Sequence, residues 1–453
     1  MVPLIYEENL NYCYFPPSLL GVGNFSYIIE YNKTHNLIFN GLSCKGFLIS
    51  IKNSDKLVQV INEPNTFKYE PAYNPLIEKL KKGGFIVDKD VNELDCIKKF
   101  YESNRSNTNH FLLSILTTYN CNFSCWYCTQ HHNHEYINSS TVKHIKKCIK
   151  HIIEERAIKI FEINWFGGEP LLYPDVIIDI SDYTKKLCNN NNITFVNGIT
   201  TNGSLLNLDL VKKIKAVDLF TFQITIDGNK TNHNKIRKCD ELLNSFDLIC
   251  NNIKLLIDWI PQCDITLRFN YTSQNLSTEV IDDINRLFSP FYRNRIEFLP
   301  RKVWQENFEN ISSIKLKDLI LKAKDSGYRV NNDYDIHHGM CYGENKNYYT
   351  IFQNGCVDKC ANIDLSMTRG YFNNDGKIEW SEKIWESENT IFNNKTPCTS
   401  CKYLPLCMGP CPVRRRSMKM KNEKFHCMFT NKEHYFTHLI QSYFDSIKSN
   451  HNE

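Results

Sequence analysis

Between about residues 110 and 330 the chain alternates short apolar runs with longer amphipathic runs. Repetition of this kind predicts βαβ units and a parallel sheet. Six such units are two short of a closed eight-fold barrel, so we expect an α/β fold with a partial, open (β/α)6 barrel of the TIM type. Its site should lie at the carboxyl ends of the strands. The expected strands are 111–117, 160–166, 194–200, 220–227, 264–271 and 295–299, with helices over 139–155, 174–187, 205–216 and 241–258.

The residues before this pattern predict a smaller α+β domain. Apolar alternation over 25–31 and 36–40, with a polar turn between them, predicts two strands. A helical pattern over 76–85 ends in glycine, as helices often do. The polar stretch 102–109 predicts a linker to the first barrel strand.

After about residue 335 the periodicity fades, and cysteine, glycine and proline become frequent. So little regular apolar pattern predicts a block that folds around bound ligands. We therefore expect three domains, which span residues 1–105, 106–330 and 331–453.

The composition narrows the class of protein. The 453 residues are 42% hydrophobic and carry a net charge of +4, which favours neither nucleic acid nor an anionic membrane as a partner. The sequence has no run of about 18 apolar residues, which a membrane-spanning helix needs. It also lacks the N-terminal pattern of a secretory signal, so we expect a cytoplasmic protein. Its 19 cysteines are unevenly spread, and in a reducing compartment clustered cysteines are typical of metal or cluster ligands.

Three of the cysteines stand close together just after the first expected strand. Cys121, Cys125 and Cys128 are spaced C-x3-C-x2-C, and the next cysteine, Cys148, falls inside an expected helix. A four-iron cluster takes four ligands, so three thiolates without a fourth leave one iron open to a substrate or cofactor. A zinc site, or three unrelated thiols, is the alternative interpretation.

This spacing resembles the signature of the radical S-adenosylmethionine (SAM) enzymes, in which an aromatic residue precedes the last cysteine. The resemblance continues through the next strands: residues 167–170 resemble the family's GGEP motif, 200–203 its TNG segment and 223–228 its QxSxDG segment. Two departures are mild, since threonine replaces the usual serine at 225 and asparagine the usual aspartate at 234. The SAM contacts that the resemblance implies are Tyr127, Gly167, Gly168, Glu169, Pro170, Thr201, Asn202, Thr225, Arg237 and Asn270.

Within this set the resemblance implies particular roles. Glycines let the backbone approach the ligand, and Glu169 can accept from the ammonium of SAM. Arg237 matches the arginine that pairs with the SAM carboxylate. The cluster of such enzymes donates one electron to SAM, which breaks into methionine and a 5′-deoxyadenosyl radical, and the radical takes a hydrogen atom from the substrate. In such enzymes the cluster and SAM perform the bond-breaking steps, while the protein orients the substrate and excludes water from the pocket.

A second group of cysteines lies near the C-terminus. Its spacing resembles the SPASM extension of radical SAM enzymes, through C-x13-G-x4-C from residue 341, C-x2-C-x5-C-x3-C from residue 398 and a last cysteine. A structural zinc module is the alternative, although one zinc ion needs only four ligands. The resemblance implies two further four-iron (4Fe-4S) clusters, three in all: a distal one on Cys398, Cys401, Cys407 and Cys427, and a proximal one on Cys341, Cys360 and Cys411.

Some features stay open at this point. The fourth position of the proximal cluster is either Cys356 or an open site, and the resemblance does not decide between them. No catalytic acid or base is assigned. The basic run 414–416 is interpreted as a solvated face, with docking of an acidic peptide segment as the alternative.

The resemblance implies a peptide or protein substrate, and two subgroups compete. One matures ribosomally made precursor peptides by forming thioether or carbon–carbon crosslinks; the other oxidises a cysteine or serine of sulfatases to formylglycine. Sulfatase-maturating enzymes begin close to the cluster motif, whereas about 110 residues precede it in this chain, a length suited to gripping a leader peptide. They also have an aspartate after the proximal-cluster cysteine, where Ala361 cannot accept a proton.

We therefore predict a radical SAM peptide maturase. Its expected partners are a precursor peptide with a leader segment and an electron donor such as flavodoxin or ferredoxin. A non-catalytic iron–sulfur or zinc protein is a third possibility, and it would require the GGEP-like and TNG-like segments to be coincidences.

Overall fold

The computed structural model describes most of the chain in two compact units. The first unit comprises residues 1–105, 334–341 and 384–453, and the second comprises 106–333 and 342–383. The C-terminal block is thus divided between the units, and the three domains expected from the sequence stay a prediction. The described residues are 20–67, 71–130, 132–239, 243–307, 310–331, 340–362, 368–381, 391–392, 396–424, 426–429 and 431–450.

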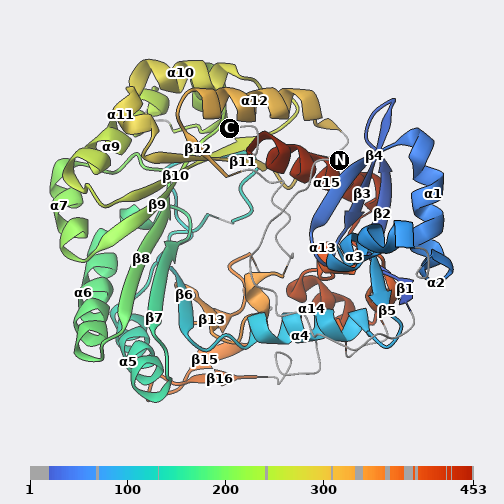
Figure 1. The fold of residues 1–453 in the computed structure, drawn as a ribbon. Coiled ribbons are helices and arrows are strands. Elements are labelled where there is room, and N and C mark those ends of the chain that lie inside the picture. The colour runs from blue at the N-terminus through green and yellow to red at the C-terminus, as the bar shows by residue number, and fades with distance from the viewer. Residues whose placement is uncertain are drawn as a thin grey trace. The chain divides into compact units, whose positions relative to one another are not determined.

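The second unit contains the partial barrel. Its six central strands are parallel neighbours in chain order, as the alternating pattern predicts (Figure 1). Each observed strand lies within two residues of its expected bounds at the start and three at the end, because buried parallel strands appear in a sequence as short continuous apolar runs. The strands are β6 (His110–Leu116), β7 (Ile160–Phe166), β8 (Thr194–Thr201), β9 (Leu219–Ile226), β10 (Asp264–Tyr271) and β11 (Ile296–Lys302).

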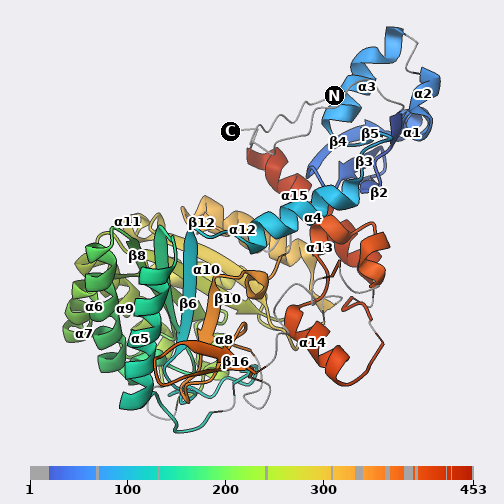
Figure 2. The ribbon, with the colours of Figure 1, turned by 90° about the horizontal axis from the view of Figure 1, so that it is seen from below.

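Helices cover the outer face of this curved sheet (Figures 1 and 2). Four of these helices begin after a capping asparagine: the Asn138 side chain, for instance, accepts from the backbone N–H of Thr141 at the start of α5. The helices are α5 (Ser139–Glu155), α6 (Pro174–Asn190), α7 (Leu208–Ala216), α8 (Lys230–Ile236), α9 (Ser245–Trp259), α10 (Glu279–Leu287), α11 (Pro290–Arg293) and α12 (Ser313–Asp325).

The sheet continues beyond both ends of the six-strand pattern. A seventh strand, β13 (Tyr348–Ile351), pairs in parallel with β6 and places Thr350 opposite Ser114. All four residues of β13 are buried, so its sequence shows no alternation that could have predicted it. The remaining strands are β12 (Arg329–Val330) at the other edge and the antiparallel β14 (Val357–Asp358), β15 (Gly370–Phe372) and β16 (Ile378–Trp380).

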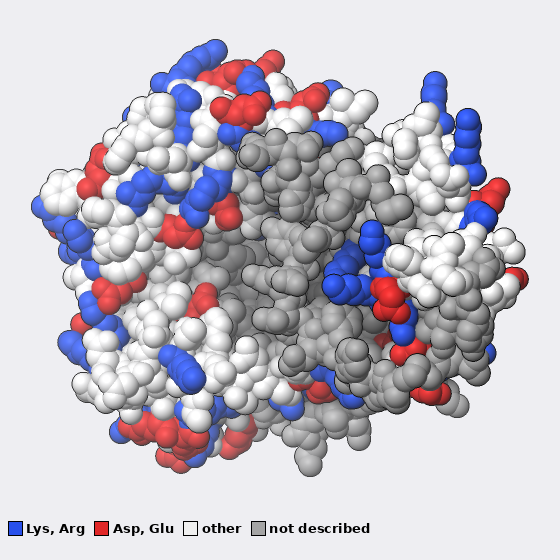
Figure 3. Space-filling view, in the orientation of Figure 1, with Lys and Arg blue, Asp and Glu red and all other residues white. Residues whose placement is uncertain are grey.

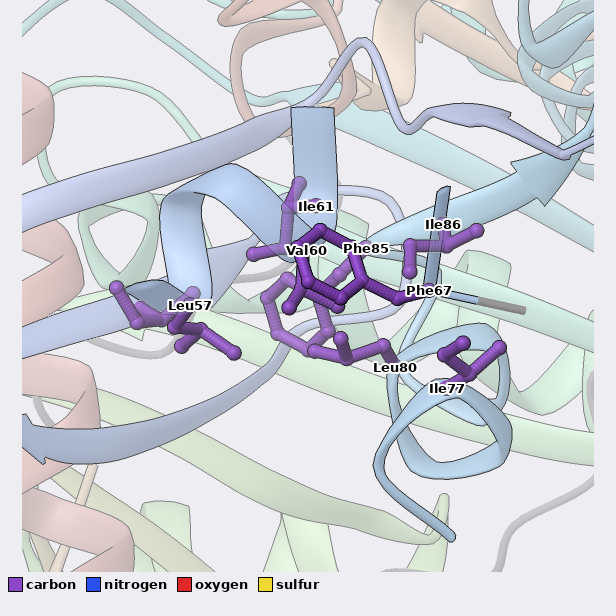
Figure 4. Packing of buried hydrophobic residues seen from close by; sticks show 9 residues of the cluster. Leu57, Val60, Ile61, Phe67, Ile77, Leu80, Phe85 and Ile86 are labelled. Carbon is purple, nitrogen blue, oxygen red and sulfur yellow. The ribbon is translucent and has the colours of Figure 1, made fainter. Parts of the chain in front are cut away.

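The first unit begins with an α+β segment. Its three-stranded antiparallel sheet has the order β2-β3-β4, and β1 pairs with β5. Helices α1 to α3 pack on the sheet through an apolar cluster that includes Leu57, Phe67, Leu80 and Phe85 (Figure 4). The elements are β1 (Leu20–Val22), β2 (Ser26–Glu30), β3 (His35–Asn40), β4 (Lys45–Ser50), α1 (Ile51–Asn62), α2 (Pro64–Phe67), α3 (Asn74–Lys82), β5 (Ile86–Asp88) and α4 (Glu93–Arg105).

The expected linker 102–109 is wrong in its first half. Helix α4 extends to Arg105, whose side chain is buried and lies 3.7 Å from the carboxylate of Glu102. Polar composition alone predicted a linker, but Ile97 and Tyr101 on the same helix are buried and hold its last turns in place. Only residues 106–109 separate α4 from the first barrel strand.

The expectation that the C-terminal block has little regular apolar pattern is wrong for its last helix. Residues Phe436, Ile440 and Phe444 recur every four positions on α15 (Lys432–Asn450) and are buried. They share one apolar core with Tyr27 and Phe39 of the N-terminal sheet. The other C-terminal helices of this unit are α13 (Leu404–Cys407) and α14 (Pro412–Met420).

The described surface carries charges of both signs. Figure 3 shows basic and acidic side chains interspersed over one face of the barrel, in line with the net charge of +4. In the part of the chain that the structure describes, no helix has the length and apolar character needed to cross a membrane.

Candidate functional site

The three clustered cysteines lie on the loop that joins β6 to α5, at the carboxyl end of the strand. Cys121 and Cys125 are half-buried and Cys128 is exposed. Burial raises the pKa of the Cys121 thiol to about 12; it also raises that of Cys125, where the nearby Arg237 charge works in the opposite direction. None of the described cysteines forms a disulfide. The three thiols are therefore available as ligands on one loop, which we call the cluster loop (residues 117–138).

The two glycines after β7 hold this loop in place. A Cβ atom on Gly167 would lie 2.3 Å from the carbonyl oxygen of Thr118, and one on Gly168 would lie 2.1 Å from that of Asn120. The close approach allows the N–H of Gly168 to donate to Thr118 (2.9 Å) and that of Glu169 to donate to Asn120 (2.8 Å). The sequence analysis expected the glycines to admit a ligand. In the structure the backbone that they admit is that of the cluster loop.

Glu169 ties the end of β7 to the end of β8. Its carboxylate is fully buried and accepts from the N–H of Leu171 (2.9 Å), the hydroxyl of Thr201 (2.7 Å) and the N–H of Asn202 (2.7 Å). Burial raises the pKa of Glu169, and these hydrogen bonds partly offset the increase. The next residue, Pro170, begins a short 3-10 helix. The GGEP-like and TNG-like segments therefore form one hydrogen-bonded edge.

Asn202 links this edge to the first cysteine. Its side-chain amide donates to Asn122 at 2.7 Å and lies 4.0 Å from the sulfur of Cys121. Its amide oxygen accepts from the backbone N–H and the hydroxyl of Ser204. The sequence-predicted residues of β7 and β8 thus converge on the cluster loop.

The other predicted contacts gather around the hydroxyl of Tyr127. This hydroxyl donates to the Asp227 carboxylate at 2.5 Å and accepts from Arg237 Nη1 (3.2 Å) and Asn270 Nδ2 (3.1 Å). Arg237 also forms an ion pair with Asp227 at 3.2 Å. Arg268 donates from Nε to the amide oxygen of Asn270 at 2.8 Å. The structure therefore brings Tyr127, Arg237 and Asn270 together, as the resemblance implied.

Asp227 is the residue of this group to which the sequence analysis assigned no role. It is fully buried at the end of β9, and burial raises its pKa while the Arg237 charge opposes the increase. Its Oδ1 atom has no hydrogen-bond partner among the described residues. A carboxylate directly after an apolar strand, at the functional edge of a parallel sheet, was the available sequence signal. Thr225, on the same strand, is buried.

His233 supports the same turn from α8. It is fully buried and accepts at Nδ1 from the backbone N–H of Asp227 at 3.2 Å. Burial and the nearby Arg237 charge hold its pKa well below the usual range, so the ring is neutral. A neutral ring can keep accepting this hydrogen bond, which fixes the start of the turn after β9.

Four C-terminal cysteines line one cavity in the first unit. The cavity opens to solvent, and its walls include Leu404, Pro410 and Phe436. The expected ligands of the distal cluster are all present in it: Cys398, Cys401, Cys407 and Cys427. We call this cavity the four-cysteine pocket.

The donor set of the four-cysteine pocket fits an iron–sulfur cluster. Burial, with a smaller contribution from the other three thiols of the pocket, raises the pKa of Cys407 to about 12. Within the described ranges, however, no three His, Cys, Asp or Glu side chains are grouped so as to hold one metal ion. Four thiols that line one pocket match the four ligands that a four-iron cluster takes.

The remaining C-terminal cysteines are spread over both units. Cys341 and Cys411 belong to the first unit and Cys360 to the second, so the proximal ligand set stays a prediction. Cys356 forms the turn of the β13–β14 hairpin, where Phe352 donates to its carbonyl oxygen at 2.9 Å, and Cys360 follows the other end of β14. The two cysteines flank the two-residue strand β14, and the choice between Cys356 and an open site stays a prediction.

Comparisons with known proteins agree with this site. Residues 115–264 match the model of the radical SAM superfamily. The chain is 31% identical over 189 residues to the cysteine-type anaerobic sulfatase-maturating enzyme of Clostridium novyi (strain NT), a match that covers 40% of this chain and 48% of that one. It is 27% identical over 218 residues to GTP 3′,8-cyclase of Clostridium perfringens (strain SM101 / Type A), over 47% and 62% of the two chains. The chain thus spans about half to three fifths of the length of these relatives.

A solved structure shares the fold. Native anSMEcpe with bound AdoMet and Kp18Cys peptide has a TM-score of 0.54 and 17% identity, and the match covers 75% of this chain and 99% of that one. AdoMet is SAM, and at this identity the likeness concerns the fold alone. The partial barrel, the cluster loop and the superfamily match together identify residues 115–264 as the radical SAM domain of an enzyme.

Proposed function

We propose that this enzyme modifies a ribosomally made precursor peptide by radical chemistry, and that residues 1–105 recognise the leader segment of that peptide. When bound, a four-iron cluster on Cys121, Cys125 and Cys128 together with SAM supplies hydrogen-atom abstraction. The observation that carries the proposal is the placement of these three thiols beside the hydrogen-bonded group of Tyr127, Asp227, Arg237 and Asn270 at the carboxyl edge of the sheet.

The chain's own residues have the task of binding and orienting SAM. We assign Arg237 to its carboxylate, because a guanidinium fork suits a planar anion. Asp227 and Tyr127 hold one end of that fork through Nη1. Since Asp227 is fully buried and Tyr127 is half-buried, the arginine is positioned before the cofactor arrives. We assign Glu169 to the ammonium group of SAM. The same carboxylate accepts the hydrogen bonds that join the ends of β7 and β8.

The substrate class rests on three observations. Ala361, which follows Cys360, leaves no carboxylate where sulfatase-maturating enzymes have an aspartate. The N-terminal α+β segment offers an antiparallel sheet of the kind that can bind an extended peptide along an edge strand. The structural neighbour holds a peptide together with AdoMet. We propose a thioether or carbon–carbon crosslink as the product, with flavodoxin or ferredoxin as the electron donor and three four-iron clusters per chain.

Formylglycine formation is the second candidate, because a sulfatase-maturating enzyme is among the matched relatives. The test uses full-length protein reconstituted without oxygen and incubated with SAM, a reductant and the Kp18Cys peptide. We expect 5′-deoxyadenosine to form by liquid chromatography, while mass spectrometry shows no formylglycine in the peptide. Formylglycine would replace the proposed function by the second candidate, and absence of 5′-deoxyadenosine would overturn the radical SAM activity itself.

Arg237→Lys tests the assignment of the SAM carboxylate. A lysine keeps the charge but cannot contact Asp227 and a carboxylate with one planar fork. We expect SAM to bind roughly 10- to 100-fold more weakly, because a hydrogen bond to a charged group is worth about 1.5–3 kcal/mol. Equilibrium dialysis with labelled SAM gives the affinity. The control is Arg286→Lys, since the Arg286 side chain is 75% exposed. Equal affinities of the Arg237→Lys variant and the unmodified protein would contradict the assignment.

A further inference from the structure

Two basic side chains, those of Lys432 and Arg415, lie at the four-cysteine pocket. Lys432, the first residue of α15, lines the pocket, and its Nζ lies 4.0 Å from the sulfur of Cys401. Arg415, on α14, donates from Nη1 to the carbonyl oxygen of Pro410 at 2.6 Å, and Pro410 is itself a wall of the pocket. Two cationic side chains from two helices therefore lie at this pocket: Lys432 beside a thiol and Arg415 beside a wall residue.

The basic run of α14 is not the solvated face that the sequence analysis expected. Arg414 is exposed, but Arg415 and Arg416 are only 5% and 1% exposed. A buried guanidinium costs free energy unless negative charge lies nearby. Arg415 contacts the backbone of Pro410 at the pocket wall, so its buried charge lies beside the pocket.

Such cations have a defined effect on an iron–sulfur group. A cluster bound by four thiolates carries net negative charge, and reduction adds one more electron. Nearby positive charge and N–H donors to the ligand sulfurs stabilise the reduced form more than the oxidised form, which raises the reduction potential. Lys432 supplies both contributions, since its ammonium is charged and its N–H faces a ligand sulfur.

We propose that Lys432 and Arg415 set the reduction potential of a cluster held in the four-cysteine pocket, and make that cluster easier to reduce than its four thiolates alone would allow. The inference rests on the cluster that the proposed function places there. It adds a function for two residues outside the ligand set: they tune the pocket as a site that accepts electrons.

The test is an electrochemical titration of the full-length, reconstituted protein, followed by electron paramagnetic resonance. The signal that a Cys398→Ser variant lacks belongs to the pocket. We expect Lys432→Gln to shift the midpoint of that signal to a more negative potential, by enough to change the ratio of reduced to oxidised cluster about tenfold at fixed potential, or about 59 mV. Lys432 is exposed, so its replacement leaves the apolar core intact.

Three further variants make the result specific. Lys432→Arg should restore the midpoint, because it keeps the charge and an N–H donor, and Arg415→Gln should shift it in the same direction as Lys432→Gln. Arg414→Gln is the matched control: an equal shift there would show that general surface charge sets the potential and would overturn the inference. An unchanged midpoint in Lys432→Gln would also overturn it. Formation of 5′-deoxyadenosine in the same samples reports separately on the proposed function.

Discussion

Replacing Cys125 with alanine is expected to abolish the formation of 5′-deoxyadenosine from SAM. The cluster loop offers three thiols, and a four-iron cluster that already leaves one iron open for SAM cannot lose a second ligand and stay bound. Cys125 is the middle cysteine of the three in sequence and is half-buried on the cluster loop. Liquid chromatography of anaerobic reactions with dithionite measures the product.

The matched control is Cys148→Ala. Cys148 is the next cysteine in the chain and is buried on α5, where burial raises its pKa to about 12 and keeps it a thiol. Its removal deletes one sulfur from an apolar contact and leaves the three ligands in place. Product formation by the Cys125→Ala variant at the level of this control would show that the cluster loop does not hold the cluster.

The second large effect is expected for Phe436→Ala. The Phe436 ring is buried, stacks on Tyr403 at 4.6 Å between ring centroids and forms a wall of the four-cysteine pocket. Truncating a buried phenylalanine costs about 3–5 kcal/mol in the free energy of unfolding. We therefore expect a lower urea midpoint for the first unit and loss of iron from the pocket, while SAM cleavage by the separate core of the second unit continues.

Ile28→Ala is the control for this effect. Ile28 lies on β2 of the same unit and is 50% exposed, so its truncation should change the free energy of unfolding by only about 0.5 kcal/mol. The iron content of both variants is measured beside the urea midpoints. Equal midpoints for the two variants would show that the core of Tyr27, Phe39 and Phe436 does not stabilise this unit.

This core also limits how leader recognition can be tested. Deleting residues 1–105 would remove Tyr27, Ile29, Leu37 and Phe39 from the core and expose the apolar side of α15. The loss of peptide modification that followed would not distinguish a lost leader site from a damaged pocket. Substitutions of exposed residues on the edge strands β2 and β4 avoid that ambiguity.

The sequence predicts the barrel well, because each strand and helix of the barrel has a recognisable pattern within its own residues. Strands β6 to β11 are continuous apolar runs between amphipathic helices, so each element carries its own signal. Strand β13 carries none: its four residues are buried through pairing with β6, more than 230 positions earlier in the chain. On α15 the spacing of Phe436, Ile440 and Phe444 is a helical signal, which the many cysteines obscured.

The candidate site was predictable as a set of residues and less so as an arrangement. Motif spacing identified Tyr127, Arg237 and Asn270 separately, and the fold brings them together at one hydroxyl. Motif spacing could not show that Asp227 binds Arg237, since that contact depends on where β9 ends relative to α8. The burial of Arg415 was equally invisible, because a run of three arginines resembles a solvated surface until its helix is packed.

The shared core of the first unit has a consequence for biosynthesis. Tyr27 donates to the carbonyl of Lys402, 375 positions later, and Gln441 donates to the carbonyl of Glu30 across 411 positions. At a translation rate of about 5–20 residues per second, the N-terminal sheet waits roughly 20 to 80 s for its partner to leave the ribosome. During that interval the nascent chain displays an uncovered apolar face, so its yield in the cell will depend on chaperones that cover this face.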